Sequence, residues 1–377
     1  MPTRRDFLKM SAAVAAISPI AAAGAQSSSE VPSSGVSGTD SLRAHAEQHG
    51  LLVGCAVAPE RLANDSQYAA LVAAQTNLLV AENAMKWRAL RPAPDKFDFT
   101  GADAILAFAA SHNQKLRGHN LCWHEALPDW FASTVTKDNA RQILTRHIEA
   151  VAGHFAGKLH SWDVVNEAID PASPRADGLR ISPWLELAGE DYIDLAFRTA
   201  RQADPKALLT YNDYGIELDT PKHVEKRAHV LALVQRLHKS SLIDAVGVQS
   251  HLSAGDDVSG EGLPDFVREL RGMGLQVFIT ELDVNTQKAQ GTADARDTEV
   301  AHIYRDYLTH MLAERNVTAV LTWGITDRYT WLNGPKYARP DGQPQRPLPF
   351  DANYAPTPAF FAERTALDSR PAAAGAA

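Results

Sequence analysis

Short apolar runs alternate with longer amphipathic stretches along most of the chain. Eight runs have the length and aliphatic content of buried strands, at residues 51–57, 77–81, 115–120, 161–165, 207–211, 245–249, 276–280 and 319–323. The stretches between them repeat apolar residues at helical spacing; in 101–112, Ile105, Phe108 and Ala109 share one face. Further helices are predicted at 139–155, 192–202, 221–238, 263–271 and 298–315.

Eight strand-then-helix units, with no sequence repeat and no abrupt change in composition, predict an α/β fold with a single (β/α)8 TIM barrel. The alternative is a doubly wound open sheet, which normally carries a glycine-rich turn after its first strand. Residues 54–59 do not supply that turn. We therefore expect the working side chains at the carboxyl ends of the strands, where the loops of such a barrel begin.

The two ends of the chain differ in composition from the predicted barrel. Residues 1–25 combine the adjacent Arg4 and Arg5, an apolar run over 10–23 and a small-residue cleavage pattern, which is typical of a twin-arginine (Tat) signal peptide. Residues 26–40 indicate a flexible linker and 369–377 a disordered tail. The barrel is therefore assigned to 41–368, and we expect an exported protein that is periplasmic or extracellular.

Composition excludes several classes of protein. The chain has 377 residues with 37 Lys+Arg and 45 Asp+Glu, so its net charge of −8 leaves no basic excess for a nucleic-acid backbone. No run after the signal approaches about 20 apolar residues, so no membrane contact is expected in the mature form. The two cysteines, Cys55 and Cys122, form no Cys-x-x-Cys pair, and whether they pair with each other is left open. We expect a monomer.

Two carboxylates stand out among the polar residues at the strand ends. Glu167 and Glu281 end strands four and seven, which face one another across the barrel mouth. Glycosidic cleavage needs such a pair: a protonated carboxyl gives its proton to the departing oxygen, and an ionised one attacks or stabilises the sugar carbon. Asn166 and Glu167 can both line a pocket only if strand four bulges, because neighbours on a regular strand point to opposite faces. Gln249 and His251, two residues apart, need no bulge.

Tryptophans supply a second indication. Of seven, Trp87, Trp123, Trp323 and Trp331 fall in or just beyond the strand ends. Indole rings pack against the flat C–H faces of sugars, whereas sugar hydroxyls need amide or charged partners. The proline-rich segment 328–350 is expected to cover part of the same site. The strand ends therefore predict a carbohydrate site.

Together these strand-end motifs resemble glycoside hydrolase family 10, the retaining endo-1,4-β-xylanases. The matching residues are Glu82-Asn83-x-x-Lys86-Trp87, Arg117-Gly118-His119, Trp123-His124, Leu127-Pro128-x-Trp130, Trp162-Asp163-Val164-Val165-Asn166-Glu167-Ala168, Asn212-Asp213-Tyr214, Gln249-x-His251, Thr280-Glu281-Leu282-Asp283 and Trp323-Gly324-x-x-Asp327. The resemblance covers roughly residues 45–365. It implies hydrolysis of internal bonds of xylan or xylo-oligosaccharides by double displacement, with no cofactor and no metal.

The resemblance also implies a role for each matching residue. Glu167 would be the general acid and later the base, and Glu281 the nucleophile. Asn166 and His119 would bind the 2- and 3-hydroxyls of the attacked sugar. The other implied roles are Gln249 and His251 beside the nucleophile, Asp283 holding the imidazole, Glu82, Asn83 and Lys86 on the next donor-side sugar, Trp123, Trp323 and Trp331 as donor-side walls, and Tyr214 stacking beyond the cleavage point.

Two places depart from the family pattern. Glu125 and Ala126 follow Trp123-His124 where the family commonly has Ser-Gln, so an amide that binds the second donor-side sugar is replaced by a methyl group. One buried hydrogen bond contributes about 0.5–1.5 kcal/mol, and its loss could lower affinity up to about tenfold. Gly215 stands where Asn is frequent, which concerns the product side.

Two alternatives from other classes remain. A metal-dependent barrel hydrolase could use His119, His124, His160 and His251, although the first strand lacks the His-x-His pair that such enzymes commonly have. A sugar-binding protein without catalysis would explain the tryptophans but not the two glutamates. The histidines at 45, 49, 112, 147, 229 and 238 lie on helices or loops and are expected to be solvated.

Overall fold

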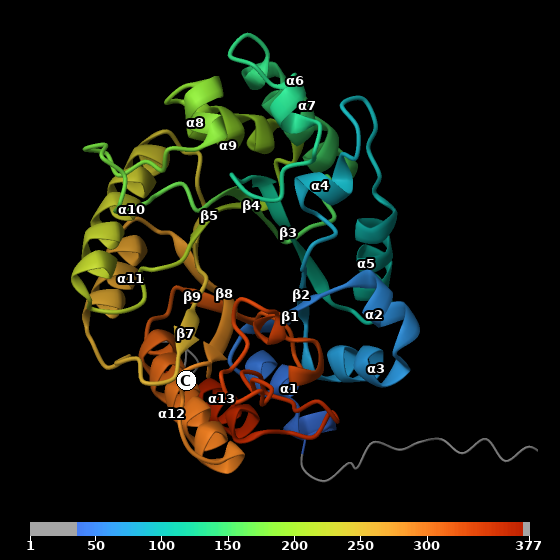
Figure 1. Cartoon of the computed structure of the whole chain (residues 1–377), viewed down its shortest axis with the longest axis vertical. Coiled ribbons are helices and arrows are strands. Elements are labelled where there is room, and N and C mark those ends of the chain that lie inside the picture. Colours follow the sequence, from blue (N-terminus) through green and yellow to red (C-terminus); the bar gives the residue numbers. More distant parts are fainter. Residues whose placement is uncertain (1–35, 372–377) are drawn as a thin grey trace, which may run out of the picture. The chain divides into compact units, whose positions relative to one another are not determined.

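The structure is a computed structural model, and it describes residues 36–371. In this range the strands are all parallel and follow the order β6-β5-β4-β3-β2-β1-β9-β8-β7, and pairing of β6 with β8 closes eight of them into a barrel (Figure 1). The strands are β1 Leu52–Val57, β2 Leu78–Ala81, β3 Lys115–Cys122, β4 Ser161–Asn166, β5 Leu208–Asp213, β6 Ala245–Val248, β7 His251–Ser253, β8 Gln276–Asn285 and β9 Val317–Thr322. The predicted single (β/α)8 barrel is confirmed.

All eight predicted strands are present, and β7 is the addition. β7 pairs in parallel with the second half of β8, where His251 lies opposite Asp283. That pairing explains why β8 continues to Asn285, beyond the predicted end at residue 280. A three-residue strand is too short to be recognised from alternation of polar and apolar residues.

The six predicted helices are all present, within about five residues of their predicted bounds, among the helices that surround the barrel in Figure 1. They are α5 Thr100–Ser111, α7 Ala140–His154, α9 Tyr192–Ala203, α10 Pro221–Lys239, α11 Gly262–Gly272 and α12 Ala293–Leu312. α12 begins five residues before its predicted start because the Thr292 hydroxyl accepts a hydrogen bond from the Ala295 amide (3.3 Å) and caps the helix there. The remaining helices are α1 Leu42–Gln48, α2 Pro59–Asn64, α3 Ser66–Gln75, α4 Trp87–Leu90, α6 Phe131–Thr134, α8 Pro183–Ala188 and α13 Pro358–Asp368, with 3-10 turns η1 Gly38–Asp40, η2 Asp327–Tyr329 and η3 Trp331–Asn333.

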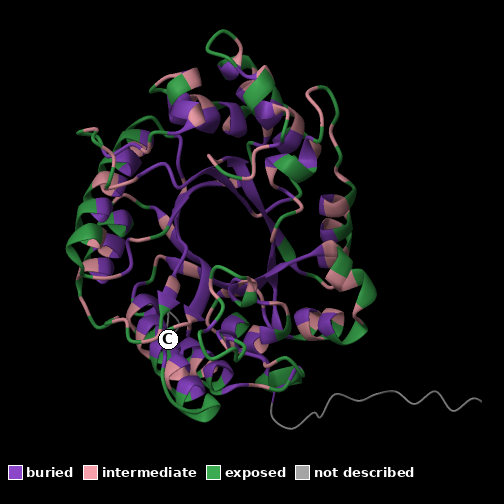
Figure 2. Cartoon of the chain, viewed as in Figure 1, coloured by how far each residue is buried: buried purple, intermediate pink, exposed green. Residues whose placement is uncertain are grey.

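Apolar side chains fill both sides of the strands. Figure 2 shows buried residues along the strands and on the inner sides of the helices, and exposed residues on the outer sides. A smaller apolar cluster fills the barrel interior: Ala56, Leu78, Val80, Ala245, Phe278, Ala319, Leu321 and Trp323. The barrel is therefore a packed core and not a pore, and space for a ligand lies at its mouth.

The predictions for the chain ends fall largely outside the described residues. The signal peptide at 1–25, residues 26–35 of the linker and residues 372–377 of the tail lie there. Where the structure describes the linker, it differs from the prediction: Val36 is buried, its carbonyl accepts a hydrogen bond from Gln75 Nε2, and η1 follows. In the predicted tail, Arg370 donates to the carbonyl of Arg315 (2.9 Å). Packing against distant segments, which composition does not reveal, joins these residues to the barrel.

None of the helices in residues 36–371 is long and apolar enough to cross a membrane.

Candidate active site

A cavity of about 430 Å³ lies at the carboxyl ends of the strands. It brings together every site residue predicted from the sequence except Glu82, Asn83 and Asp283. Its lining consists of Lys86, His119, Trp123, Glu125, Asn166, Glu167, Tyr214, Gln249, His251, Glu281, Trp323, Trp331, Lys336 and Tyr337.

Glu167 follows the end of β4 and is only 9% exposed. Its carboxyl accepts hydrogen bonds from Gln249 Nε2 (2.9 Å) and Trp123 Nε1 (2.9 Å). Burial raises the pKa of Glu167, and the negative charges of Asp213 and Glu281 add to this effect. The two hydrogen bonds oppose the increase without cancelling it. The side chain therefore keeps its proton to a higher pH than an ordinary glutamate, as a proton donor must.

Glu281, in β8, has the opposite electrostatics although it is also buried (5% exposed). Burial alone would raise its pKa, but the hydrogen bond from His251 and the charges of His119 and His251 bring it down to about 2. His251 is a strong donor because Asp283 and Glu281 raise its pKa well above the usual value, against the effect of desolvation. Its Nδ1–H donates to Asp283 (2.9 Å) and its Nε2–H to Glu281 (3.2 Å). Glu281 is thus ionised under conditions in which its partner carboxyl is protonated.

Two buried amides connect the carboxyl groups. Asn166 Nδ2 donates to Glu167 Oε1 (3.1 Å), and Asn212 Nδ2 donates both to Asn166 Oδ1 (2.8 Å) and to Glu281 Oε1 (2.8 Å). The Thr280 hydroxyl donates to Asn212 Oδ1 (2.7 Å), which keeps the NH2 group of Asn212 toward the site. Asn212 was recognised in a strand-end motif but not assigned to the site; its position between two carboxylates depends on contacts across three strands.

The backbone of β4 is irregular where the sequence requires it. The register against β5 shifts between Asp163 and Val165, and Glu167 has φ 57°, in the left-handed region that few residues with a side chain adopt. Asn166 and Glu167 both line the cavity as a result. The predicted irregularity is present, and it begins two residues earlier than the Asn-Glu pair.

Gln249 and His251 reach the cavity by a different route from the one predicted. β6 ends at Val248, Ser250 has φ 66°, and His251 opens β7. The expectation of one regular strand is wrong, because a sharp break lies between the two residues. Both side chains still line the cavity.

Three tryptophans form the aromatic walls. Trp323 lies edge-on to His119 (5.4 Å between ring centroids), and Trp331 lies beside His251 (5.2 Å). Trp331 Nε1 donates to Asp283 (2.7 Å), so Asp283 stands behind the imidazole and outside the cavity lining. These contacts place the rings of Trp323 and Trp331 beside two histidines that line the same cavity as the pair of carboxylates.

Trp87 is not part of this wall. It is 1% exposed, donates to the Leu121 carbonyl (2.7 Å) and stacks on His147 (3.5 Å between ring centroids). His147 itself is fully buried, so the expectation that it is solvated is wrong. Both residues occupy the core between β3 and the helices, where their burial follows from packing that their positions in the sequence do not show.

The predicted donor-side group is divided between the cavity wall and the layer behind it. The Lys86 ammonium lies over the rings of Trp123 (5.2 Å) and Trp323 (5.6 Å), and it donates to Asn83 Oδ1 (3.0 Å). Glu82 forms an ion pair with Arg61 and accepts a hydrogen bond from Asn83 (3.3 Å). Glu82 and Asn83 are not among the residues that line the cavity; Asn83 contacts Lys86 directly, and Glu82 contacts it through Asn83.

Glu125, Lys336 and Tyr337 complete the lining. Gln345 connects both ends of the segment that carries Lys336 and Tyr337. Its Nε2 donates to the carbonyls of Leu332 (3.0 Å) and Tyr337 (2.6 Å). The proline-rich segment was expected at the site, but Lys336 carried no signal because an exposed lysine is ordinary anywhere on a surface.

In the described part of the chain, the histidines of the metal alternative do not gather into a metal-binding cluster. Within residues 36–371 there is no group of three or more His, Cys, Asp or Glu side chains that could hold a metal ion. His119 Nδ1 bonds to Asp163 (2.9 Å), and His160 lies at the amino end of β4, next to Ser161 (3.1 Å).

Cys55 and Cys122, whose pairing was open, are both buried and free.

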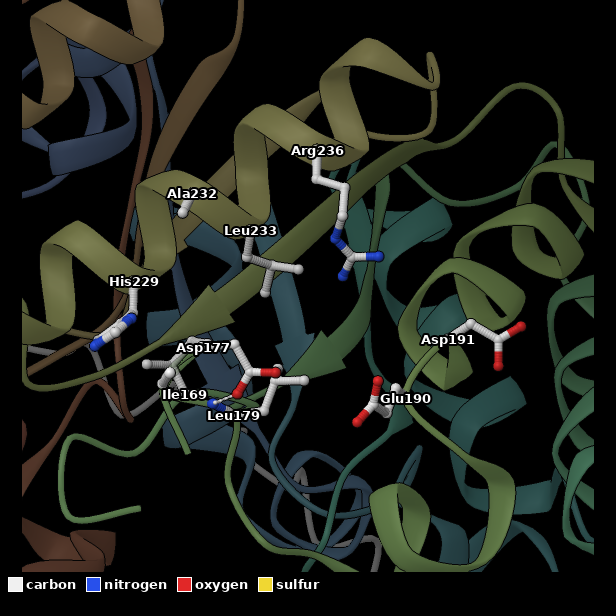
Figure 3. A pocket seen from close by; sticks show the side chains of 10 residues that line it. Ile169, Asp177, Leu179, Glu190, Asp191, His229, Ala232, Leu233 and Arg236 are labelled. Atoms are coloured by element: carbon white, nitrogen blue, oxygen red, sulfur yellow. Dashed lines mark hydrogen bonds between the residues drawn. The ribbon is translucent and has the colours of Figure 1, made fainter. Parts of the chain in front are cut away.

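A second hollow of about 500 Å³ lies between α10 and the loop after β4, with an apolar floor that includes Leu179 and Leu233 (Figure 3). Its charged rim is paired internally: Arg175 with Asp177 and Glu190, Arg141 with Asp191, and Arg236 with Asp194. Each carboxylate that lines this hollow pairs with an arginine, whereas Glu167 and Glu281 at the barrel mouth face the same cavity without an arginine partner among the described residues.

Comparisons with known proteins found relatives that match most of the chain. Endo-1,4-beta-xylanase A of Thermoanaerobacterium saccharolyticum is 35% identical over 325 residues, which are 82% of this chain and 26% of that protein. Exoglucanase XynX of Acetivibrio thermocellus is 35% identical over 325 residues, 82% of this chain and 28% of that protein. The crystal structure of native xylanase 10B from Thermotoga maritima has 32% identity and a TM-score of 0.79, covering 87% of this chain and 98% of that one.

The chain spans between 26% and 30% of the length of the first five curated relatives that it matches. The family model described as Glycosyl hydrolase family 10 matches residues 41–366, nearly the whole barrel. With the barrel, the strand-end motifs and the match in agreement, this chain belongs to glycosyl hydrolase family 10.

Proposed function

We propose that this protein is a retaining endo-1,4-β-xylanase that cleaves internal bonds of xylan by double displacement. One observation carries the proposal: two carboxyl groups in one tryptophan-walled cavity have pKa values displaced in opposite directions, Glu167 upward and Glu281 downward. This is the division of labour that a two-carboxylate glycosidase needs. The family assignment supplies xylan as the expected substrate.

In the first step the Glu281 carboxylate attacks the anomeric carbon, and the bond from that carbon to the leaving oxygen breaks. The leaving oxygen takes the proton of Glu167, and a glycosyl ester on Glu281 remains. In the second step the Glu167 carboxylate accepts a proton from water, whose oxygen attacks the same carbon and releases Glu281. Two inversions give net retention, and we expect the carboxyl groups to lie about 5–5.5 Å apart.

The neighbouring residues are assigned to the sugars on either side of the cleaved bond. Asn166 and His119 bind the 2- and 3-hydroxyls of the attacked sugar, and Lys86 reaches the next donor-side sugar between Trp123 and Trp323. Tyr214, which is 39% exposed at the cavity, is placed to stack on the acceptor sugar. Gln249, His251 and Trp331 complete the contacts, with Asp283 as the support of His251.

Product analysis on unbranched xylan tests the proposal. A ladder of short xylo-oligosaccharides with new reducing ends, the β-anomer appearing first by proton NMR, is expected from internal cutting with retention. Initial formation of the α-anomer would show inversion, and release of one short product from the chain ends would contradict internal cutting. Binding of xylan with no reducing ends released would favour the sugar-binding alternative.

Two controls address the other readings. One relative is named an exoglucanase, so cello-oligosaccharides are assayed beside xylo-oligosaccharides, and faster cleavage of the glucose-based series would overturn the substrate assignment. Activity is also measured with a strong chelator. Loss of activity that a divalent metal restores would support the metal-dependent alternative.

Export by the twin-arginine route, to the periplasm or the medium, belongs to the same proposal, as does a monomer without membrane contact. Its support is the sequence alone: adjacent Arg4 and Arg5, an apolar run and a cleavage pattern. Replacing both arginines by lysine should leave the precursor in the cytoplasm, and continued export would contradict it. Gel filtration with light scattering tests the monomer.

A further inference from the structure

A buried ion pair lies behind the acceptor side of the cavity. Asp213, at the end of β5, is 0% exposed, and Lys226, in α10, is 3% exposed; Lys226 Nζ lies 2.7 Å from Asp213 Oδ1. Removing two charges from water is costly and offsets most of their mutual attraction, so such a pair contributes little net stability. Its other contacts lead to the active site.

One set of contacts leads to the proton donor. The Tyr211 hydroxyl donates to Asp213 Oδ2 and accepts hydrogen bonds from the amides of Ala168 (3.1 Å) and Ile169 (3.2 Å). These two amides immediately follow Glu167, whose backbone is in the left-handed region. A residue with a side chain stays in that region only when its surroundings hold it there. Asp213 thus orients the Tyr211 hydroxyl, and this hydroxyl fixes the backbone turn at Glu167 through the two amides that follow it.

A second set of contacts leads to the sugar-stacking ring. The Lys226 ammonium lies 3.9 Å from the centroid of the Tyr214 ring, and the Tyr214 amide donates to Asp213 Oδ1 (2.9 Å). A cation at this distance is attracted to the ring face. Next in the chain, Gly215 has φ 68°, and a Cβ there would lie 3.7 Å from Lys226 Cδ, so this departure from the family pattern borders the same lysine.

We propose that Asp213 and Lys226 are a positioning pair that holds the Glu167 turn and the Tyr214 ring as one unit. The inference rests on the proposed function, because it concerns departure of the acceptor sugar: that sugar stacks on Tyr214 while its oxygen takes the proton of Glu167. Neither Asp213 nor Lys226 lines the cavity. The pair acts through the two residues that it holds.

Two substrates separate this role from a general effect on the fold. Xylotetraose needs both a proton for its leaving oxygen and an acceptor-side ring. A dinitrophenyl β-xylobioside needs neither, because dinitrophenolate leaves without protonation and no sugar occupies the acceptor side. The value of kcat/KM reports the first chemical step for both substrates.

Lys226→Met and Asp213→Asn should each lower kcat/KM for xylotetraose about 10- to 100-fold and change that for the aryl xylobioside by less than about threefold. The double variant should be no worse than the poorer single variant, because the two residues act as a unit. If Lys226→Met does not fold, Asp213→Asn, which nearly preserves side-chain size, is assayed over a range of pH, because removing the Asp213 charge also lowers the pKa of Glu167. A loss on xylotetraose that persists at low pH supports positioning, and a loss that disappears there would overturn the inference.

Asp204→Asn is the matched control. Asp204 is another fully buried carboxylate, which accepts hydrogen bonds from the Gly157 amide (3.0 Å) and Trp162 Nε1 (3.2 Å) beyond the amino end of β4. This variant should lose stability but keep the wild-type ratio of the two kcat/KM values. Equal losses on both substrates in the Asp213 and Lys226 variants, or no loss on either, would overturn the inference while the proposed function stands. A wild-type protein that cleaves neither substrate would overturn both.

Discussion

Replacing His251 by Asn should move the acid limb of the pH profile to higher pH. Glu281 has a pKa of about 2 instead of the usual 4.5, a difference equivalent to about 3 kcal/mol in favour of the carboxylate. His251 donates to this carboxylate as a cation, and a hydrogen bond from a charged group contributes about 1.5–3 kcal/mol. Without it the burial of Glu281, which raises the pKa, is opposed more weakly, by the charges of His119 and Lys86 and by the hydrogen bond from Asn212.

The assay is kcat/KM for a dinitrophenyl β-xylobioside over about pH 3 to 9, because this ratio follows ionisation of the free enzyme. The acid limb of His251→Asn should lie about one to two pH units above that of the wild type, which corresponds to a roughly 2- to 10-fold loss at pH 3, the lower end of the assay. His160→Asn, at the amino end of β4, is the control and should keep the wild-type limb. A folded His251 variant whose acid limb is unchanged would refute the account of Glu281.

Three further outcomes are expected. Glu281→Ala should abolish turnover, and added azide should restore formation of a glycosyl azide of inverted configuration; wild-type turnover without azide would contradict the nucleophile. Trp331→Ala should raise KM for xylo-oligosaccharides, because one aromatic wall of the cavity is removed; an unchanged KM would argue against a sugar at this wall. Burial raises the pKa of Glu363 to about 8, and its Oε2 lacks a hydrogen-bond partner. The folded protein holds this proton up to about pH 8, whereas the unfolded chain loses it near pH 4.5, so the wild type loses stability as the pH rises between these values. Glu363→Gln should therefore increase the free energy of unfolding near pH 8 by up to about 4 kcal/mol, with a higher melting temperature, and should have no such effect near pH 4. Equal effects at both pH values would contradict this.

Much of the site was predictable because a parallel barrel places the end of every strand at one rim. Apolar runs located the eight strands, and the residues that follow them therefore had to converge. Together with the need of glycosidic cleavage for paired carboxyl groups, that rule indicated Glu167 and Glu281, and it required an irregular β4 if Asn166 and Glu167 were both to line the site. The same rule could not separate Trp123, which reaches the cavity, from Trp87, which packs against His147 in the core. Both indoles lie near strand ends, and only contacts between distant segments distinguish them.

Local pattern in the chain thus established the barrel, the two carboxylates and the aromatic character of the mouth, since strand period and strand ends are properties of short segments. The protonation state of each carboxylate was decided by the folded structure. It depends on burial and on charges from other strands: Asp213 near Glu167, and His119 and His251 near Glu281. Lys226 illustrates the same limit, because a lysine in an amphipathic helix is ordinarily solvated, and only the packing of α10 against β5 turns its ammonium inward. Electrostatic energies depend on distances in space, which neighbouring positions in a sequence do not contain.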